Sequence, residues 1–150
     1  MNRRSRGFTI IEMIVALVVG GILTSIALVS YHNVRGRFSV RGARNSFAAL
    51  QARARADAIE RGQDTWLVAD MAGDSVYLVR GGTTLETMHF DDEFHVDLRS
   101  TSGDFRLCMT PRGYADPGCS GSISSIVTLQ FWQNADSCSV QVLPMGQLEW

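Results

Sequence analysis

A single carboxylate, Glu12, stands at the edge of a long apolar stretch. From Met13 to Val34 the chain has 22 residues without Asp, Glu, Lys or Arg. A helix of about 20 such residues spans the ~30 Å hydrocarbon core of a bilayer. An ionised carboxylate at the start of such a helix is costly and usually has a partner. The chemistry that Glu12 offers is therefore charge pairing, and the alternative is an unpaired carboxylate at the membrane interface.

Three cysteines could form a covalent cross-link. Cys108 and Cys119 flank a loop of ten residues that closes easily, whereas a bond from Cys119 to Cys138 would tie this loop to the last strands. Because the number of cysteines is odd, one thiol either stays unpaired or bonds to a cysteine of another chain. The spacing of a zinc site is missing, so no metal is expected. The sequence favours the bond between Cys108 and Cys119 and leaves the alternative open.

Other groups that could do chemistry are isolated. Asp91, Asp92, Glu93 and Asp97 could supply oxygens to Ca²⁺, but no loop glycine or EF-hand spacing accompanies them, which favours a solvated acidic turn. The serine-rich segment 120–125 has no nucleophile-elbow context. We therefore expect neither an enzyme nor a bound cofactor.

Charged residues are sorted by position along the chain. Residues 1–7 carry three Arg, residues 8–31 carry only Glu12, residues 32–62 have a balance of +5, and residues 63–150 have a balance of −8. This predicts a basic leader, a membrane-grade apolar segment, an amphipathic segment and a polar domain. The positive leader should hold the N-terminus in the cytoplasm, which places the last domain outside it.

The apolar segment has two conventional interpretations. A cleavable secretory signal has an apolar core of about 7–15 residues followed by a small-residue cleavage site, but this core is longer and residues 28–32 form a poor site. A plain signal anchor fits the length but leaves Glu12 unexplained.

One long helix is predicted over about residues 8–61. No proline interrupts it between Phe8 and Ile59, and Gly62 can terminate it. Arg53, Asp57 and Arg61 follow at four-residue intervals and could form a charge ladder on one exposed face. Apolar residues recur near the helical period after residue 32, namely Val34, Phe38, Ala43, Phe47, Leu50, Ala54 and Ala58.

After Gly62 the apolar period changes to two, which is typical of strands. Strands are predicted at about 65–69, 75–80, 84–90, 94–99, 104–109, 126–132, 138–143 and 148–150, with a loop at 110–125. The fold class is therefore α+β, with one long N-terminal helix packed on a C-terminal antiparallel β-sheet domain.

The segment from Arg6 to Glu12 reads Arg-Gly-Phe-Thr-Ile-Ile-Glu. It resembles the class III signal of type IV pilins and type II secretion pseudopilins, in which a basic leader ends in Gly and Glu is the fifth residue after the cut. The resemblance implies that prepilin peptidase cleaves between Gly7 and Phe8 and that Phe8 is N-methylated. It also gives Glu12 a partner, since the new amine of a neighbouring subunit could meet this carboxylate during assembly.

The rest of the chain is similar to the GspH/FimT family of minor pilins and pseudopilins. The similar segments are the helix end at 54–62, the strand and Pro-x-Gly element at 107–113, and the last strand with its glycine at 138–146. The resemblance implies a pilin-like fold and a structural subunit of a type IV pilus or a type II secretion pseudopilus, acting in filament initiation or at the tip. The expected partners are prepilin peptidase, other pilin subunits and inner-membrane lipid, with one membrane pass and a periplasmic domain before assembly.

One departure concerns nucleic acid. Some FimT-like proteins bind DNA through a C-terminal Gly-Arg-x-Arg motif, but residues 146–150 read Gly-Gln-Leu-Glu-Trp. Both arginines are missing, and a domain with a balance of −8 repels phosphate. We therefore expect no nucleic-acid partner. A DNA-receptor pilin and a membrane-anchored protein outside any filament remain the alternative functions.

Overall fold

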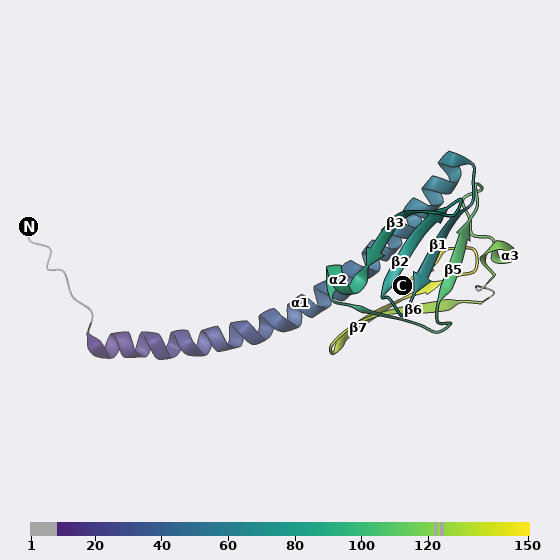
Figure 1. Ribbon diagram of the computed structural model, residues 1–150. Coiled ribbons are helices and arrows are strands. Elements are labelled where there is room, and N and C mark those ends of the chain that lie inside the picture. Colours follow the sequence, from purple (N-terminus) through teal and green to yellow (C-terminus); the bar gives the residue numbers. More distant parts are fainter. Residues whose placement is uncertain (1–8, 122, 124) are drawn as a thin grey trace, which may run out of the picture. The chain divides into compact units, whose positions relative to one another are not determined.

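The computed structural model describes residues 9–121, 123 and 125–150, with the backbone alone for residues 27–35 (Figure 1). The chain divides into two compact units, one ending at Arg35 and one spanning Gly36–Trp150. The elements are α1 (Ile10–Arg61), β1 (Thr65–Asp70), β2 (Ser75–Arg80), β3 (Thr83–His89), α2 (Phe90–Phe94), β4 (Asp97–Ser100), β5 (Phe105–Met109), α3 (Pro117–Ser120), β6 (Val127–Gln133), β7 (Asp136–Val142) and β8 (Leu148–Glu149).

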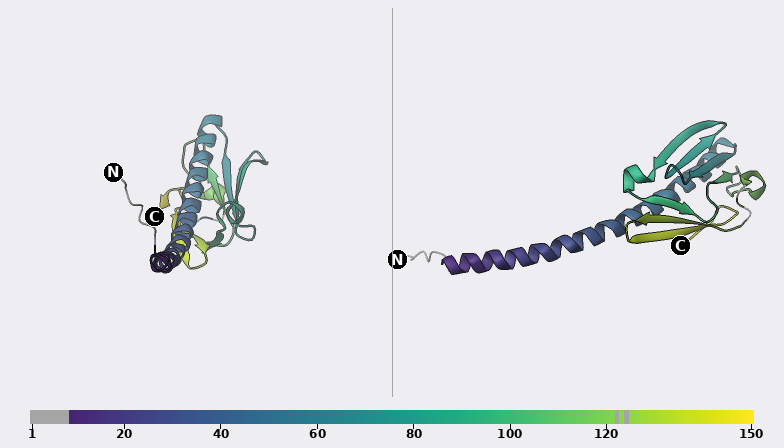
Figure 2. Two further views of the ribbon diagram at one scale, coloured as in Figure 1. Left: turned by 90° about the vertical axis from the view of Figure 1, so that its left-hand side faces the viewer. Right: turned by 60° about the horizontal axis from the view of Figure 1, so that its bottom comes forward.

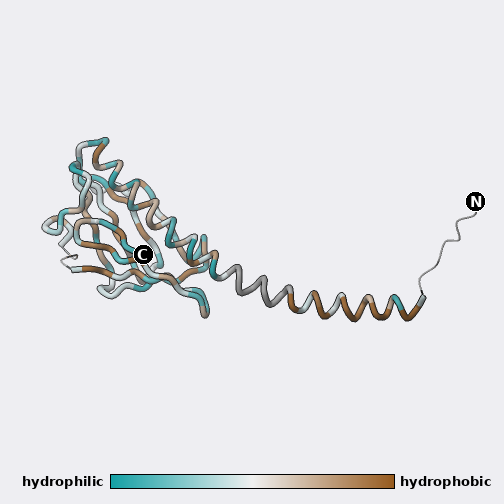
Figure 3. The backbone as a smooth tube through the Cα atoms, turned by 180° about the vertical axis from the view of Figure 1, so that it is seen from behind, coloured by the Kyte–Doolittle hydropathy of each residue, from teal (hydrophilic) through white to brown (hydrophobic). Residues whose placement is uncertain are grey.

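The first unit contains the N-terminal part of α1. Its large apolar side chains from Ile10 to Ile26 are between 49% and 80% exposed, and Figure 3 shows hydrophobic residues along this whole segment. Exposed apolar surfaces of this extent are uncommon on soluble monomers and are typical of interaction surfaces.

Among the residues that the structure describes, no helix has both the length and the apolar character needed to cross a bilayer. The segment 8–31 predicted as the span includes residue 8 and the side chains of residues 27–31, which lie outside the described part.

In the second unit, α1 buries one face. Its buried apolar residues are Val40, Ala43, Phe47, Leu50, Ala54 and Ala58. The prediction was wrong for Phe38, which is 69% exposed. Phe38 lies five residues before Ala43, a step that rotates it away from a face spaced at three and four residues, and Val40 takes its place. The side chain of Val34 lies outside the described residues.

The strands form two antiparallel sheets beside residues 36–61 of α1 (Figures 1 and 2). The first sheet has the order β3-β2-β1-β5 and the second has the order β4-β6-β7-β8. A shared core joins the inner faces of both sheets to α1, and the Phe47 and Phe131 rings meet there at 6.2 Å. The predicted class, a helix packed on an antiparallel β-sheet domain, is therefore confirmed.

The acidic segment after β3 is helical. The structure forms α2 there, and His95 closes it with a left-handed backbone (φ +54°). Phe90 explains this turn, because its ring is fully buried and lies 5.8 Å from the Phe131 ring. Asp91, Asp92 and Glu93 consequently occupy the exposed side of one helical turn.

Charged side chains of α1 pair with the first sheet. Asp57 accepts hydrogen bonds from Arg80 on β2 and from the buried Thr65 hydroxyl on β1 (2.8 Å), and Arg53 pairs with Glu86 on β3. The charge ladder along the helix predicted from Arg53 and Asp57 is therefore wrong, because strands distant in sequence supply the opposite charges. The predicted helix end is confirmed, since α1 stops at Arg61 and Gly62 has φ +63°.

Candidate functional site

The first turn of α1 positions Glu12. Thr9 precedes the helix, and its hydroxyl oxygen accepts a hydrogen bond from the backbone N–H of Glu12 at 3.3 Å. The Thr9 carbonyl accepts the N–H of Met13 at 3.2 Å. These contacts satisfy donors that would otherwise be unpaired at a helix N-terminus. Glu12 is therefore held on the first helical turn with its side chain exposed.

This role of Thr9 was not among the predictions made from the sequence. The signal was present, because Thr-x-x-Glu before an apolar run is the pattern of a capping box. In a capping box the third helical residue can be Glu or Gln, so the local requirement at position 12 does not include a negative charge. A carboxylate there does favour the positive end of the helix dipole.

The surroundings of Glu12 are apolar. Met13, Ala16 and Leu17 border its side chain on the same part of the helix, in a shallow hollow. All three are exposed, so the described chain presents Glu12 as one charge on an apolar surface open to another molecule. Gly7 and Phe8, the residues predicted to flank the cleavage site, lie outside the described residues.

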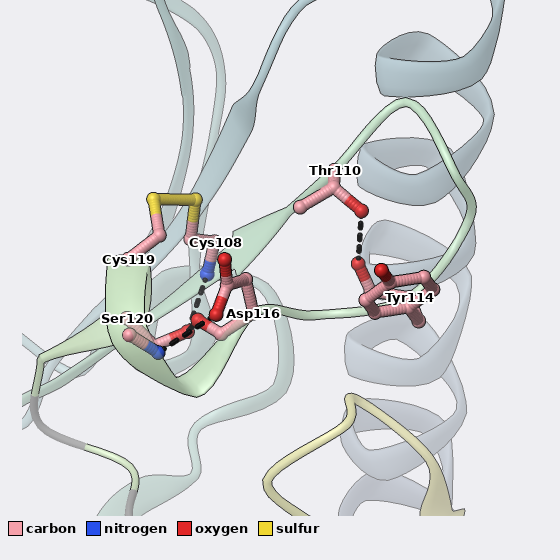
Figure 4. The surroundings of a disulfide bond; sticks show 7 residues. Cys108, Thr110, Tyr114, Asp116, Cys119 and Ser120 are labelled. Carbon is pink, nitrogen blue, oxygen red and sulfur yellow. Dashed lines mark hydrogen bonds between the residues drawn. A yellow bond between two sulfur atoms is a disulfide. The ribbon is translucent and has the colours of Figure 1, made fainter.

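The cysteines lie in the second unit. Cys108 on β5 and Cys119 on α3 form a disulfide, with their Cα atoms 5.8 Å apart. The Ser120 hydroxyl, at the end of α3, accepts the N–H of Cys108 at 3.0 Å and donates to the carbonyl of Asp116, the residue before α3, at 2.8 Å, which ties α3 to β5 (Figure 4). The disulfide therefore closes a loop that hydrogen bonds also hold.

Cys138 on β7 is a free thiol. It is half-buried, and its Sγ donates to the Val40 carbonyl of α1 at 3.1 Å. Burial raises the pKa of this thiol, and the positive charges of Arg44 and Arg41 offset part of the increase. Cys138 is therefore a weak nucleophile at neutral pH.

The described residues gather one group that resembles a metal site. Asp64, Cys108 and Cys119 bring their ligand atoms within 4.8 Å of one another, but both sulfurs belong to the disulfide. A disulfide sulfur is not a thiolate, so this group does not suit a metal ion.

The C-terminal segment is fastened to α1. Gly146 (φ +77°) presents its carbonyl to Gln51 Nε2 at 2.6 Å and to an Arg55 guanidinium nitrogen at 2.8 Å. Beyond it, β8 pairs with β7, and the Trp150 ring lies 4.6 Å below the Arg44 guanidinium. At the position of the arginine motif through which some FimT-like proteins bind DNA, this chain has a strand paired with β7 and an acidic residue, Glu149.

Comparisons with known proteins support the N-terminal assignment and the fold. A family model described as the prokaryotic N-terminal methylation motif matches residues 2–28. No curated protein matches the sequence. Two crystal structures of the type IV minor pilin FimU from Pseudomonas aeruginosa strain PAO1 are similar, at 15% and 14% identity with TM-scores of 0.53 and 0.54.

These alignments cover 73% and 75% of this chain, and 90% and 88% of the FimU chains. At such identities the likeness shows a shared fold, whereas the methylation motif comes from the sequence itself. The chain thus carries a prokaryotic N-terminal methylation motif at residues 2–28, and its helix-on-sheet fold is similar to that of the type IV minor pilin FimU.

Proposed function

We propose that the protein is a minor pilin, a structural subunit that prepilin peptidase cleaves between Gly7 and Phe8 and N-methylates at Phe8. The methylation motif at residues 2–28 is the observation that carries this proposal. The chain would act as a substrate of that peptidase and as a filament component, without a catalytic activity of its own. The filament is a type IV pilus or a type II secretion pseudopilus, in which the chain acts in initiation or at the tip.

The apolar first unit supports a filament role. Before assembly, residues 8–31 would anchor the chain in the inner membrane, with the second unit in the periplasm. Within a filament, the exposed apolar side chains from Ile10 to Ile26 would be covered by the same segments of neighbouring subunits. The same apolar surface would therefore contact lipid before assembly and protein within the filament.

Glu12 would set the register of that packing. Cleavage would create a positive amine at Phe8, and a staggered neighbour would bring this amine to the Glu12 carboxylate. Removing one member of a buried ion pair typically costs about 3–5 kcal/mol, because the other charge is left without a partner. Among the residues that the structure describes, the contact of Glu12 with Thr9 uses the backbone N–H, which would leave the carboxylate for a neighbour.

Mass spectrometry of the chain purified from its own host tests the processing step. The expected mature N-terminus is methyl-Phe8, and a Gly7→Val variant should retain Met1 because a bulky residue replaces the small one at the cut. A matched Arg4→Gln variant, which keeps Gly7, should still be cleaved. A wild-type chain that retains its leader would contradict the proposal.

A further inference from the structure

Aromatic and arginine side chains form a surface on the second unit. Phe38, Arg41 and Arg44 follow one another on α1 at three-residue intervals, which makes them neighbours on the helix surface. The Arg44 guanidinium lies 4.6 Å from the centre of the Trp150 ring, so the surface continues onto the C-terminal segment. Phe38 is 69% exposed and Trp150 is 68% exposed. We call these four residues the arginine–aromatic surface.

The two arginines of this surface have no acidic partner among the described residues. The ion pairs of α1 in that part of the chain are made by other residues, and Arg44 Nε is buried without a hydrogen-bond partner. Arg41 is exposed, and both positive charges act on the same thiol, Cys138. Like charges one turn apart on a helix repel each other. An anion bound by Arg41 and Arg44 would relieve this repulsion.

The acidic helix α2 lies on another side of α1. The Phe94 carbonyl of α2 accepts the Ser39 hydroxyl at 2.6 Å, and a Cβ added at Gly42 would lie 3.3 Å from the Phe94 ring. At about 100° per helical residue, Arg41 and Arg44 lie on the side of α1 opposite to Ser39 and Gly42. The three carboxylates of α2 are therefore kept away from the arginine–aromatic surface.

The arginine–aromatic surface follows closely after the apolar segment in the sequence. The residues without a charge end at Val34, and Phe38, Arg41 and Arg44 come four, seven and ten residues later. These spacings correspond to about 6, 10 and 15 Å of helix. The headgroup layer adds roughly 5–8 Å to each side of the hydrocarbon core, and long arginine side chains can extend toward it. In a membrane-anchored chain, this surface would thus lie at the level of the lipid phosphates.

The chemistry of the surface matches an anionic leaflet. Guanidinium groups bind phosphate through several N–H donors, and aromatic side chains are enriched at the membrane interface. Repulsion between such a leaflet and α2 acts in the same sense, because it favours an orientation with α2 away from the lipid and Arg41 toward it. We propose that Phe38, Arg41, Arg44 and Trp150 form a contact site for anionic phospholipid headgroups. This inference rests on the membrane anchoring that is part of the proposed function.

Quenching of tryptophan fluorescence by a headgroup nitroxide tests the contact. The full chain is reconstituted in vesicles of phosphatidylcholine alone, or of phosphatidylcholine and phosphatidylglycerol at about two to one, each with a phosphatidylcholine that carries the nitroxide on its headgroup. Because Trp66 and Trp132 also emit, the Trp150 contribution is the difference between the wild type and Trp150→Phe. We expect this quenching to be about twofold stronger with phosphatidylglycerol, and to fall at about 1 M salt, which screens the charges.

Charge variants locate the contact on α1. Arg41→Gln should remove at least half of the difference in Trp150 quenching between the two kinds of vesicle, because it deletes a phosphate-binding charge and leaves the Arg44 contact with Trp150 in place. Arg61→Gln is the matched control. Arg61 is also an exposed arginine of α1, but it lies about 30 Å of helix beyond Arg41 and should not affect the quenching.

Flotation of the same vesicles separates this inference from the proposed function. A chain that floats with the vesicles but shows equal Trp150 quenching in both lipid compositions would overturn the lipid site alone, and would point to a protein partner for the arginines. Equal effects of Arg41→Gln and Arg61→Gln would overturn it as well, because the effect of charge would then not be local. A chain that does not float with the vesicles would contradict the membrane anchoring and the lipid site together.

Discussion

Glu12 combines a local contact with a proposed intermolecular one. Its backbone N–H donates to Thr9, and a carboxylate in the first helical turn interacts favourably with the helix dipole by about 0.3–1 kcal/mol. That local gain is small beside the cost of an unpaired charge in an apolar bundle. The two roles are separable, because Gln at position 12 preserves the capping pattern and removes the charge.

Asp57 is the residue whose loss should most disturb the contact between α1 and the first sheet. An Asp57→Ala variant removes a partner from Arg80 and from the Thr65 hydroxyl, which is fully buried. We expect a loss of about 1–3 kcal/mol of unfolding free energy in urea denaturation. Arg53→Ala is the control, because Arg53 is 63% exposed and its ion pair should contribute less than about 1 kcal/mol. Equal losses in the two variants would show that burial does not govern these pairs.

Cys138 should react slowly with alkylating reagents. Burial raises its pKa above the ordinary value of 9.0, so the fraction of thiolate at pH 8 is lower in the folded chain than in the unfolded chain. The rate of iodoacetamide labelling under non-reducing conditions should continue to rise beyond pH 9.0 in the folded protein. Labelling of the urea-unfolded chain provides the reference. A folded-state midpoint at or below that reference would contradict the assignment.

At the scale of elements, the segment between β7 and β8 is fastened to α1 at one carbonyl. Gly146 has φ +77°, and an added Cβ would lie 2.9 Å from Ala115 Cβ and from Met109 Cε. Gly146→Ala should therefore cost about 1–3 kcal/mol or more through strain and crowding, measured by thermal or urea denaturation.

A Gly82→Ala variant separates the cost of backbone strain from the cost of crowding. Gly82 has a similar backbone angle (φ +82°), but no atom lies within 4 Å of an added Cβ. We expect its cost to be limited to backbone strain of about 1–2 kcal/mol. If both alanine variants lose the same stability, then close packing around Gly146 contributes nothing.

Local patterns predicted the strands well and long-range contacts less well. The β1–β2 hairpin follows from alternating apolar residues around a Gly-Asp turn, and these signals lie within a few residues of one another. The division into two sheets depends on pairings such as β1 with β5, which join segments about 40 residues apart. Similarly, α2 forms because Phe90 enters a core built by distant strands.

At the candidate site, too, local features were predictable from the sequence, whereas features that depend on long-range pairing were not. The position of Glu12 on a helix was predictable from the apolar run, and the Thr9 cap was predictable from the Thr-x-x-Glu pattern. The hollow lined by Trp66 and Tyr77 was not predictable, because these residues come together only through the register of β1 and β2. A single tryptophan in a strand pattern gives no indication of which face it occupies until the partner strands are known.

At the scale of the whole molecule, the second unit has its own core. The core residues begin at Val40, whereas the apolar residues from Ile10 to Ile26 are all exposed. A chain starting at Gly36 should therefore fold without detergent and melt within a few degrees of the full chain, as followed by circular dichroism. Aggregation or loss of the cooperative transition would show that the second unit needs the first.

The central claim is that a charge at position 12, beyond its local helix contact, directs assembly. Its most direct measurement is the amount of the chain recovered in sheared filaments of the native host, quantified against the membrane-held pool. We predict that Glu12→Gln lowers this incorporation at least tenfold, while Thr9→Ala, which removes the cap and keeps the carboxylate, leaves most of it intact. Wild-type incorporation of Glu12→Gln would contradict the account, because a neighbour's amine would then have no need of that carboxylate.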